Sequence, residues 1–254
     1  MKKFIPILLA VMVISCSKTH APVIPDFVVS PYKIATATGG PSTLRIYTAK
    51  YAGNLITALV SSDDSISILY NSAGRPLSKI RYANSIVFPT NKQEFDYDGN
   101  GNIISDRLYS GAGGFYALYE TAVFHYSANK LSEMIVRDDT GAQSFRFAYT
   151  WTGADITLIK EYDTLDHYSC TDTLSYDLSH TNNIAVDFPD YHILDPSYEP
   201  GLYEELFCQH PLTRMAHSCT GVVDNSNYTY DASGRIRNID NGPTYAGYLF
   251  TYTN

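Results

Sequence analysis

The sequence YTYDASGRI at residues 228–236 contains the features that decide the fold. Its first three residues alternate aromatic and polar side chains, a period of two that predicts a β-strand with one buried face. Asp231 then begins a four-residue turn, where its carboxylate can accept hydrogen bonds from backbone amides further along the turn. Gly234 occupies the fourth position, where a positive φ costs little. The stretch therefore predicts a β-hairpin closed by a type I turn and a left-handed residue.

The same turn template recurs along the chain. Full copies begin at Tyr70, Tyr97, Tyr149 and Tyr230, and they place their turn glycines at Gly74, Gly101, Gly153 and Gly234. Shorter or longer versions begin at Tyr51, Tyr126 and Tyr176. Copies begin about 19 to 29 residues apart, which is the length of one hairpin plus its return loop. Between Tyr176 and Tyr230 the interval is twice as long, so one unit is missing or replaced there.

The segments that flank the turns also have a period of two. Apolar and polar residues alternate at 66–70, 94–98, 145–152, 184–188 and 248–252. Because the polar face carries Asp, Arg, Thr and Ser, we expect the aromatic face to be the interior. Consecutive hairpins pair with their neighbours, and a long twisted sheet tends to curl. We predict an all-β, antiparallel up-and-down meander curled into a soluble barrel or roll. A transmembrane barrel, which needs an apolar outward face, is the alternative.

The N-terminus reads as an export and lipidation signal. Two lysines precede an unbroken apolar stretch at residues 4–14, and small Ser15 stands before Cys16, as in a bacterial lipobox. The apolar stretch is too short to span a bilayer, which takes roughly 20 residues. We expect Cys16 to be the acylated first residue of the mature protein. An ordinary secretory peptide with an incidental cysteine is the alternative.

The chain divides into three segments by composition. We expect a signal peptide at 1–15, a lipidated cysteine with a proline-containing tether at 16–41, and a single β-meander domain at 42–254. Removal of 1–15 takes away two lysines and no acidic residue, which leaves 16 basic and 26 acidic side chains and a net charge of −10. A surface with that charge is unsuited to nucleic acid.

The hairpin units carry a family resemblance. The form Tyr-Asp-x-x-Gly-Arg-Ile at 230–236, and its looser copies, look like the YD units of RHS-type repeats. Together with the lipobox, the arrangement resembles a Bacteroidota lipoprotein family grouped as domain of unknown function 4595, with a porin-like β fold. The resemblance implies an architecture and supplies no activity. The residue after the cysteine is Ser17 and not Asp. By resemblance to lipoproteins that are sorted by this residue, we expect the protein in the outer membrane, on either its periplasmic face or the cell surface.

The irregular segment at about 187–219 departs from the repeat. It interleaves acidic residues with Tyr191, Tyr198 and Tyr203. One interpretation is a ligand-binding loop that presents tyrosines to a glycan or an envelope protein, because binding residues concentrate on loops held by rigid scaffolds. Its carboxylate spacing does not match a calcium loop. The alternative is a solvated connection with no binding role.

A symmetric pattern of cysteine and histidine lies inside this segment. Antiparallel pairing across residues 211–216 would place Cys208 opposite Cys219 and His210 opposite His217. An oxidising compartment favours a Cys208–Cys219 disulfide. A Cys2His2 zinc site or two unpaired buried thiols are the alternatives, and Cys170 is left as a free thiol in each case.

The sequence contains little that indicates catalysis. Asp163, Asp166 and His167 lie close together, and an Asp/His pair is the minimum for base chemistry, although such residues at a strand end are usually on the surface. No nucleophile elbow, zinc-protease motif or phosphate-binding loop is present. We therefore expect a non-enzymatic outer-membrane lipoprotein with a binding or scaffolding role and neither a metal nor a cofactor. A glycan- or small-ligand-binding module and a hydrolase with dispersed carboxylates are the alternatives.

Overall fold

The computed structural model describes residues 33–39, 45–53, 55–62, 64–83, 91–112, 115–182, 208–240 and 248–253. Every regular element in these ranges is a β-strand. In order, the strands are β1 (Lys33–Gly39), β2 (Arg45–Ala52), β3 (Leu55–Val60), β4 (Asp64–Tyr70), β5 (Pro76–Ala83), β6 (Asn91–Tyr97), β7 (Ile103–Ala112), β8 (Phe115–Ser127), β9 (Lys130–Asp138), β10 (Gln143–Thr152), β11 (Asp155–Tyr162), β12 (Tyr168–Tyr176), β13 (Leu212–His217), β14 (Val223–Asn225), β15 (Asn227–Tyr230), β16 (Ile236–Asp240) and β17 (Tyr248–Thr253). A helix long and apolar enough to cross a membrane is not found among them.

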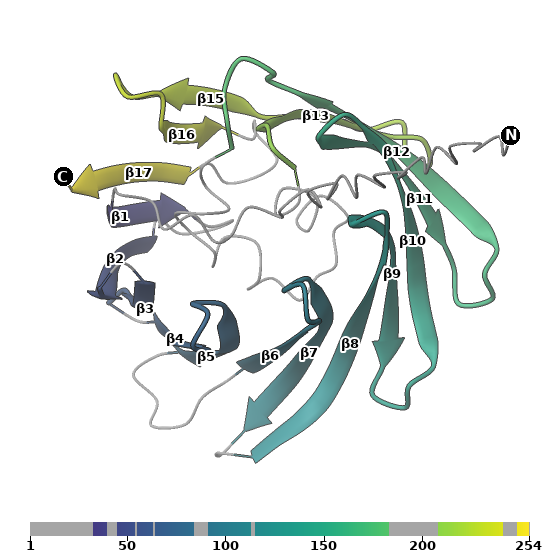
Figure 1. The fold of residues 1–254 in the computed structure, drawn as a ribbon, viewed down its shortest axis with the longest axis horizontal. Helices are drawn as coiled ribbons and strands as arrows, with labels where there is room; N and C mark the ends of the chain where they lie inside the picture. Colours follow the sequence, from purple (N-terminus) through teal and green to yellow (C-terminus); the bar gives the residue numbers. More distant parts are fainter. Residues whose placement is uncertain are drawn as a thin grey trace, which may run out of the picture.

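Neighbouring strands pair antiparallel around a curled sheet (Figure 1). The ladder runs from β2 to β14 in chain order, and β1 pairs with both β2 and β17, so the first and last strands are neighbours. β15, β16 and β17 continue it on the other side of β1. β14 and β15 follow each other in the chain with one residue, Ser226, between them. The predicted all-β, up-and-down meander is confirmed.

The sheet begins earlier than the sequence predicts. β1 lies inside the segment 16–41, which we expect to be a tether, and it pairs with two other strands. Its sequence, KIATATG, alternates small and polar residues without aromatics, so it lacks the signal that marks the other strands.

Five hairpin turns share one hydrogen-bond pattern. In each, the side-chain oxygen Oδ1 of the first residue accepts hydrogen bonds from the backbone amides two and four residues on, at 2.8–3.1 Å. The first residues are Asn71, Asp98, Asp138, Asp163 and Asp231. The fourth residues all have positive φ: Gly74 (76°), Gly101 (90°), Gly141 (86°), Asp166 (63°) and Gly234 (79°). The side-chain oxygen is therefore the acceptor for two backbone amides of each turn.

Gly153 belongs to a different turn from the one predicted. Thr152 pairs directly with Asp155, which leaves a two-residue loop with Gly153 at φ 62°. Here Trp151 and Thr152 remain in β10, so no four-residue turn forms. A hairpin loop of this length also needs a residue that tolerates positive φ, which explains why glycine fits both turns.

Aromatic side chains link each hairpin to the one before it. Tyr97 lies just before a turn, and its hydroxyl donates a hydrogen bond to the backbone carbonyl of Pro76, at 2.7 Å. Pro76 is in turn the ladder partner of Tyr70, the aromatic residue of the preceding hairpin. Six such bonds, at 2.6–2.8 Å, run from Tyr70 to Ile56, Tyr97 to Pro76, Tyr126 to Ile103, Trp151 to Leu131, Tyr176 to Ile156 and Tyr228 to Leu212. We call this end of the sheet the aromatic-turn end.

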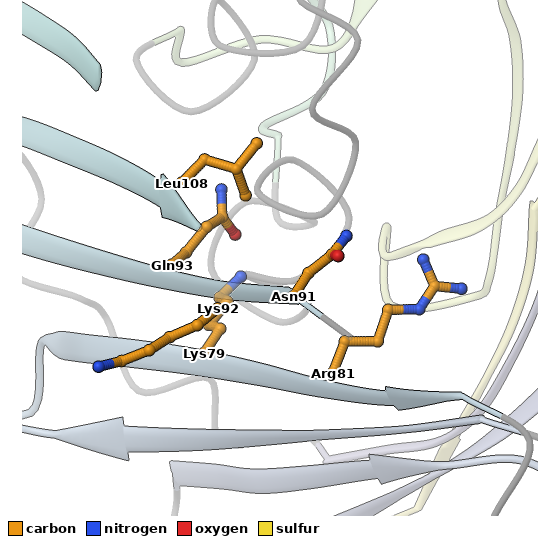
Figure 2. Close-up of a pocket in the computed structure, with 6 residues that line it drawn as sticks. All are labelled: Lys79, Arg81, Asn91, Lys92, Gln93 and Leu108. Carbon is orange, nitrogen blue, oxygen red and sulfur yellow. The ribbon is translucent and has the colours of Figure 1, made fainter. Parts of the chain in front are cut away.

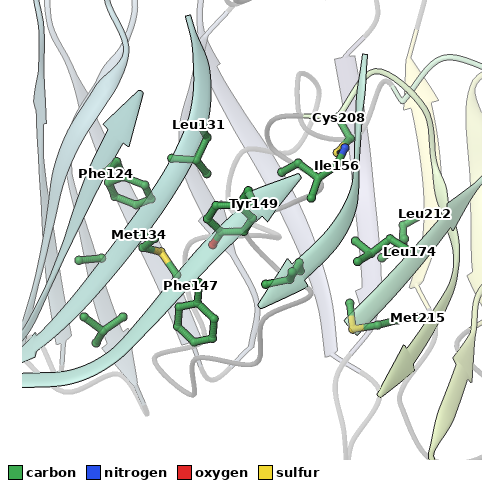
Figure 3. Packing of buried hydrophobic residues seen from close by; sticks show 13 residues of the cluster. Phe124, Leu131, Met134, Phe147, Tyr149, Ile156, Leu174, Cys208, Leu212 and Met215 are labelled. Atoms are coloured by element: carbon green, nitrogen blue, oxygen red, sulfur yellow. The ribbon is translucent and has the colours of Figure 1, made fainter. Parts of the chain in front are cut away.

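The inward faces of the strands form two apolar clusters in the described residues. The larger lies on β8–β13 and includes Phe124, Met134, Phe147 and Ile159 (Figure 3). The smaller joins β3 and β4 to β16 and includes Ile66 and Ile236. Burial of each Ile, Leu or Phe side chain contributes about 1.5–3 kcal/mol, so the period-two pattern of the sequence stabilises the curled sheet.

The aromatic link predicts a specific stability loss. Because Tyr97→Phe removes only the hydroxyl that Pro76 accepts, we expect it to lower the free energy of unfolding by about 1 kcal/mol. Urea unfolding measures the loss. Tyr119→Phe is the matched control, since Tyr119 is 58% exposed and should leave the urea midpoint unchanged. Equal midpoints for the two variants would contradict the structural role of the link.

The turns also predict acid sensitivity. The backbone amide of His167 is the main cause of a lowered pKa at Asp163, and the Thr140 hydroxyl lowers the pKa of Asp138. A lowered folded-state pKa gives stabilisation that is complete above the ordinary carboxyl pKa of about 4. It is lost as the pH falls through the lowered value.

We therefore expect Asp138→Asn/Asp163→Asn to flatten the loss of stability between about pH 5 and pH 2.5, because asparagine accepts the same amides without taking up a proton. Asn71 already has this arrangement in its own turn. The measurement is the urea midpoint as a function of pH, with Asp139→Asn as the control in the same turn. An acid limb as steep as that of the unmodified protein would exclude the turns as its source.

Candidate functional site

A group of buried polar side chains lies on β5–β8, away from the aromatic-turn end. On β6, Phe95 is buried near the turn, and Gln93, two residues further from it, faces the same way. Gln93 pairs with Lys79 on β5, which is 1% exposed. Asp106 and Glu120 on β7 and β8 are also buried. On β6 the inward face is therefore apolar next to the turn and polar further from it.

A small pocket opens in this polar part (Figure 2). Its lining consists of Lys79, Arg81, Asn91, Lys92, Gln93 and Leu108. The side chains of Arg81, Asn91 and Gln93 extend to the same side of β5 and β6. Lys92 faces the other way, since it forms an ion pair with Glu94 on the outward face, at 2.5 Å. Two cationic side chains and two amides thus face the pocket from inside the sheet.

Gln93 has one satisfied and one unsatisfied end. Its Nε2 donates to Asp106 Oδ2 at 3.3 Å, which fixes the orientation of the amide because a carboxylate accepts hydrogen bonds. Its Oε1 is buried without a hydrogen-bond partner. A buried acceptor without a donor costs about 1–3 kcal/mol, so this oxygen is a destabilising feature of the described interior.

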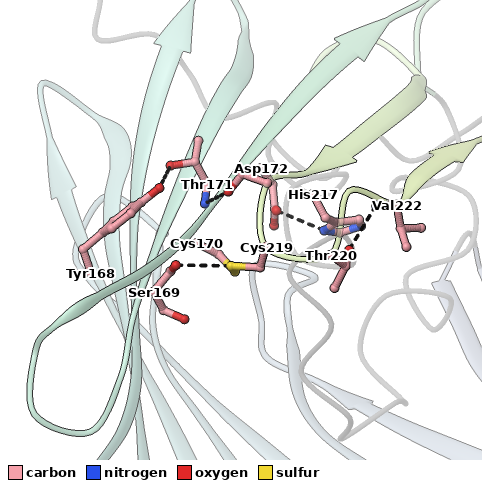
Figure 4. Close-up of a disulfide and its surroundings, with 10 residues drawn as sticks. Tyr168, Ser169, Cys170, Thr171, Asp172, His217, Cys219, Thr220 and Val222 are labelled. Atoms are coloured by element: carbon pink, nitrogen blue, oxygen red, sulfur yellow. Dashed lines mark hydrogen bonds and ion pairs between the residues drawn. A yellow bond between two sulfur atoms is a disulfide. The ribbon is translucent and has the colours of Figure 1, made fainter.

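A second polar group lies on β12–β14. His217 Nδ1 is 3.0 Å from Asp172 Oδ1 (Figure 4). His217 Nε2 is 2.9 Å from Asp224 Oδ2. Burial raises the pKa of Asp172, and His217 opposes that shift. Burial and the nearby Asp172 raise the pKa of Glu161. Because carboxylates occupy both ring nitrogens of His217, the imidazole has no free nitrogen with which to act as a general base.

The predicted Cys208–Cys219 disulfide is wrong. The structure joins Cys170 to Cys219, with a Cα–Cα distance of 5.4 Å (Figure 4). Residues 212–217 form β13, which pairs with β12 and β14, so the chain does not reverse where the symmetric pattern requires a turn. Cys170, predicted to be free, lies near the start of β12 and is brought to Cys219 by the pairing of β12 with β13.

Cys208 is buried and is not part of the disulfide. The backbone amide of Ile156 donates to its Sγ at 3.3 Å, and the hydroxyl of Tyr176 lies 3.2 Å from the same sulfur. His210 is held elsewhere, with its Nδ1 2.7 Å from Oδ2 of buried Asp155. The four residues of the hypothetical Cys2His2 site therefore have four different environments. In the described part of the chain, no cluster of His, Cys, Asp and Glu has the geometry of a metal site.

The Asp–His contacts were missed by sequence reasoning. Asp155 and His210 are 55 residues apart, and Asp172 and His217 are 45 apart, so no local spacing indicates either pair. By contrast, Asp163, Asp166 and His167 do form the local cluster seen in the sequence. Asp163 accepts the amides of a turn, and Asp166 pairs with Arg146 at 2.5 Å. That cluster builds a turn and orients an outward-facing arginine.

Other sequence predictions lie outside the described residues. These are the acylated cysteine and the loop tyrosines, namely Cys16, Tyr191, Tyr198 and Tyr203.

No protein-family model matches the chain, and no curated protein matches it. Solved structures similar to it include a porin-like protein from Bacteroides vulgatus ATCC 8482, at 11% identity over 87% of this chain and 99% of that one, with a TM-score of 0.47. A porin-like protein from Bacteroides uniformis ATCC 8492 is 11% identical over 87% and 96%, with a TM-score of 0.43. A DUF3836 family protein from Bacteroides vulgatus is 15% identical over 31% and 88%, with a TM-score of 0.27.

The disulfide predicts a defined chemical map. We expect non-reducing peptide mapping of exported protein to find Cys170 linked to Cys219 and Cys208 as a thiol that is alkylated only after unfolding. Cys170→Ser should lower the free energy of unfolding by about 4 kcal/mol, the chain-entropy value for cysteines 49 residues apart. Cys208→Ala is the control and should leave the linkage intact. A Cys208–Cys219 peptide would contradict the pairing.

Proposed function

We propose that the protein is a non-enzymatic lipoprotein of the outer membrane that binds a ligand at the polar end of its curled sheet. The observation that carries the proposal is the buried, unpartnered Gln93 Oε1 beside two inward-facing cations. Binding sites place a few convergent polar groups in a concavity held by rigid elements, and β5, β6 and β7 supply such a frame.

The polar groups of the described interior support binding better than catalysis. His217 has both nitrogens engaged by carboxylates, and His210 is held by Asp155. Neither histidine has a hydroxyl or thiol nucleophile among its hydrogen-bond partners, which the triad logic of covalent catalysis requires. A hydrolase that relies on either histidine as its base therefore has less support than a binding protein.

Charged side chains on the outward face of the strands favour a domain that is surrounded by water. Arg107 pairs with Asp96, and Arg146 pairs with Glu133 at 3.1 Å, across neighbouring strands. Such ladders of charge on the outside are costly next to lipid tails. A lipid on Cys16, following the export signal, would then hold the domain at the membrane surface, because several acyl chains give stable anchoring.

Exposed aromatic rings favour a glycan as a second candidate ligand. Phe115 on β8 is 85% exposed and Tyr119 is 58% exposed, while Phe145 on β10 is 41% exposed. Flat aromatic surfaces stack against sugar rings with little loss of side-chain entropy. The proposal therefore includes a glycan or an envelope protein among the partners.

The anchor makes a direct prediction. We expect the mature protein to carry acyl chains on Cys16 and to fractionate with membranes, and we expect Cys16→Ala to leave the protein unprocessed or wrongly placed. Intact-mass analysis and membrane fractionation provide the measurements. Thr19→Ala, three residues further along, is the control and should behave like the unmodified protein. A membrane form without added acyl chains would exclude lipid anchoring.

A further inference from the structure

We propose that Asp172, His217 and Asp224 form a pH-dependent link between β12, β13 and β14. We call these three residues the Asp–His–Asp group. The group holds one proton more than a neutral imidazole with two carboxylates, and loss of that proton as the pH rises releases β14 from β13. The proposal depends neither on a ligand nor on the lipid anchor.

The pairing of the three strands brings the side chains together. Asp172 on β12 is the ladder partner of His217 on β13, and Asp172 Oδ1 lies 3.0 Å from His217 Nδ1 (Figure 4). Asp224 on β14 is the ladder partner of Met215, which is two residues from His217 and on the same face. The Oδ2 of Asp224 lies 2.9 Å from Nε2 of the same ring. The imidazole therefore joins β12 to β14 across β13.

The two contacts of His217 require a proton that the separate groups do not supply near neutral pH. A neutral imidazole has one N–H donor and one acceptor nitrogen, whereas an ionised carboxylate only accepts hydrogen bonds. With a neutral ring between two carboxylates, one ring nitrogen would face an oxygen with no hydrogen between them. One additional proton, on the ring or on a carboxyl group, makes both contacts hydrogen bonds.

The surroundings of the Asp–His–Asp group favour retention of this proton. Asp172 is 2% exposed, and burial raises the pKa of its carboxyl group although His217 opposes the shift. Glu161 on β11 lies on the same face, because its ladder partner Cys170 is two residues from Asp172. Burial and Asp172 raise the pKa of Glu161, and His217 opposes this shift too. Carboxyl groups from β11, β12 and β14 thus face one imidazole, and an additional proton reduces their mutual repulsion.

β14 is the strand that depends most on this link. It consists of three residues, Val223–Asn225, and its ladder with β13 has three register pairs. β12, by contrast, pairs with both β11 and β13, and the Cys170–Cys219 disulfide joins it to the turn after β13. Because loss of the proton leaves a ring nitrogen opposite a carboxylate, we expect the short strand to separate first.

The pH dependence of this link has the opposite sign to that of the turn aspartates. A carboxyl group whose folded-state pKa is raised favours the fold below its ordinary pKa of about 4. That contribution is lost as the pH rises through the raised value, and the pKa values of Asp172 and Glu161 are both raised. We therefore expect β14 to be better protected at about pH 5 than at about pH 8.

Hydrogen exchange measured by NMR on the full chain tests the proposal. We expect the protection factors of the β14 amides, corrected for the intrinsic pH dependence of exchange, to fall at least about tenfold between about pH 5 and about pH 8. Asp224→Asn should abolish this fall, because its amide can donate to a neutral ring while the other ring nitrogen donates to Asp172. Asp139→Asn, at an exposed turn position, is the control and should show the same fall as the unmodified protein.

A second measurement on the unmodified protein counts the protons directly and does not require that Asp224→Asn folds. The NMR shifts of the His217 ring nitrogens and of the Asp172 and Asp224 carboxyl carbons should show the additional proton at about pH 5. A neutral ring beside two ionised carboxylates at that pH would overturn the proposal. So would β14 protection with the same pH dependence in folded Asp224→Asn and in the unmodified protein.

Discussion

The hydrogen bond from an aromatic side chain to the backbone carbonyl of the preceding hairpin is the interaction on which the rest of the structure depends. Each acceptor residue is the ladder partner of the previous aromatic residue, so the bonds form a chain around the aromatic-turn end. Burial raises the pKa of the Tyr97 and Tyr126 hydroxyls. The chain holds the register of successive hairpins where strand ladders alone would allow slippage.

The inward face of β5 and β6 carries different side chains near the turns and further from them. At the aromatic-turn end, turns, aromatic rings and apolar side chains are occupied by packing. At the opposite end, Gln93 and Lys79 continue the same inward face with polar groups. A buried polar group usually lowers stability, and the stability of the regular hairpins offsets this loss. The candidate site therefore lies away from the turns, among residues that the aromatic hydrogen bonds do not involve.

The sequence shows local structure well and distant contacts poorly. The Asx–Gly turn is contained in five residues, so Asn71, Asp98 and Asp231 could be recognised directly. Two turns do not match the sequence template. No tyrosine precedes Asp138, and the turn that begins at Asp163 has Asp166 at the position where the template has glycine.

The Cys170–Cys219 bond and the pocket depend on which strands become neighbours. Cys208 and Cys219 are closer in sequence, but β13 passes between them as an extended strand. Gln93 faces Lys79 only because of the register of β6 on β5. No periodicity within one strand contains that information, so these contacts could not be predicted from spacing.

The pairing of β1 with β17 has a consequence for how the protein reaches this state. Lys33 and Thr253 are ladder partners although 220 residues separate them, whereas most other ladders join strands adjacent in the chain. The hairpins can form one by one as the chain emerges, but this last ladder must wait for the C-terminal strand. Pairings this distant slow folding, and until this ladder forms β1 and β17 are open edges that other chains could join. The ladder between β1 and β17 can therefore form only after residues 248–253 have been synthesised.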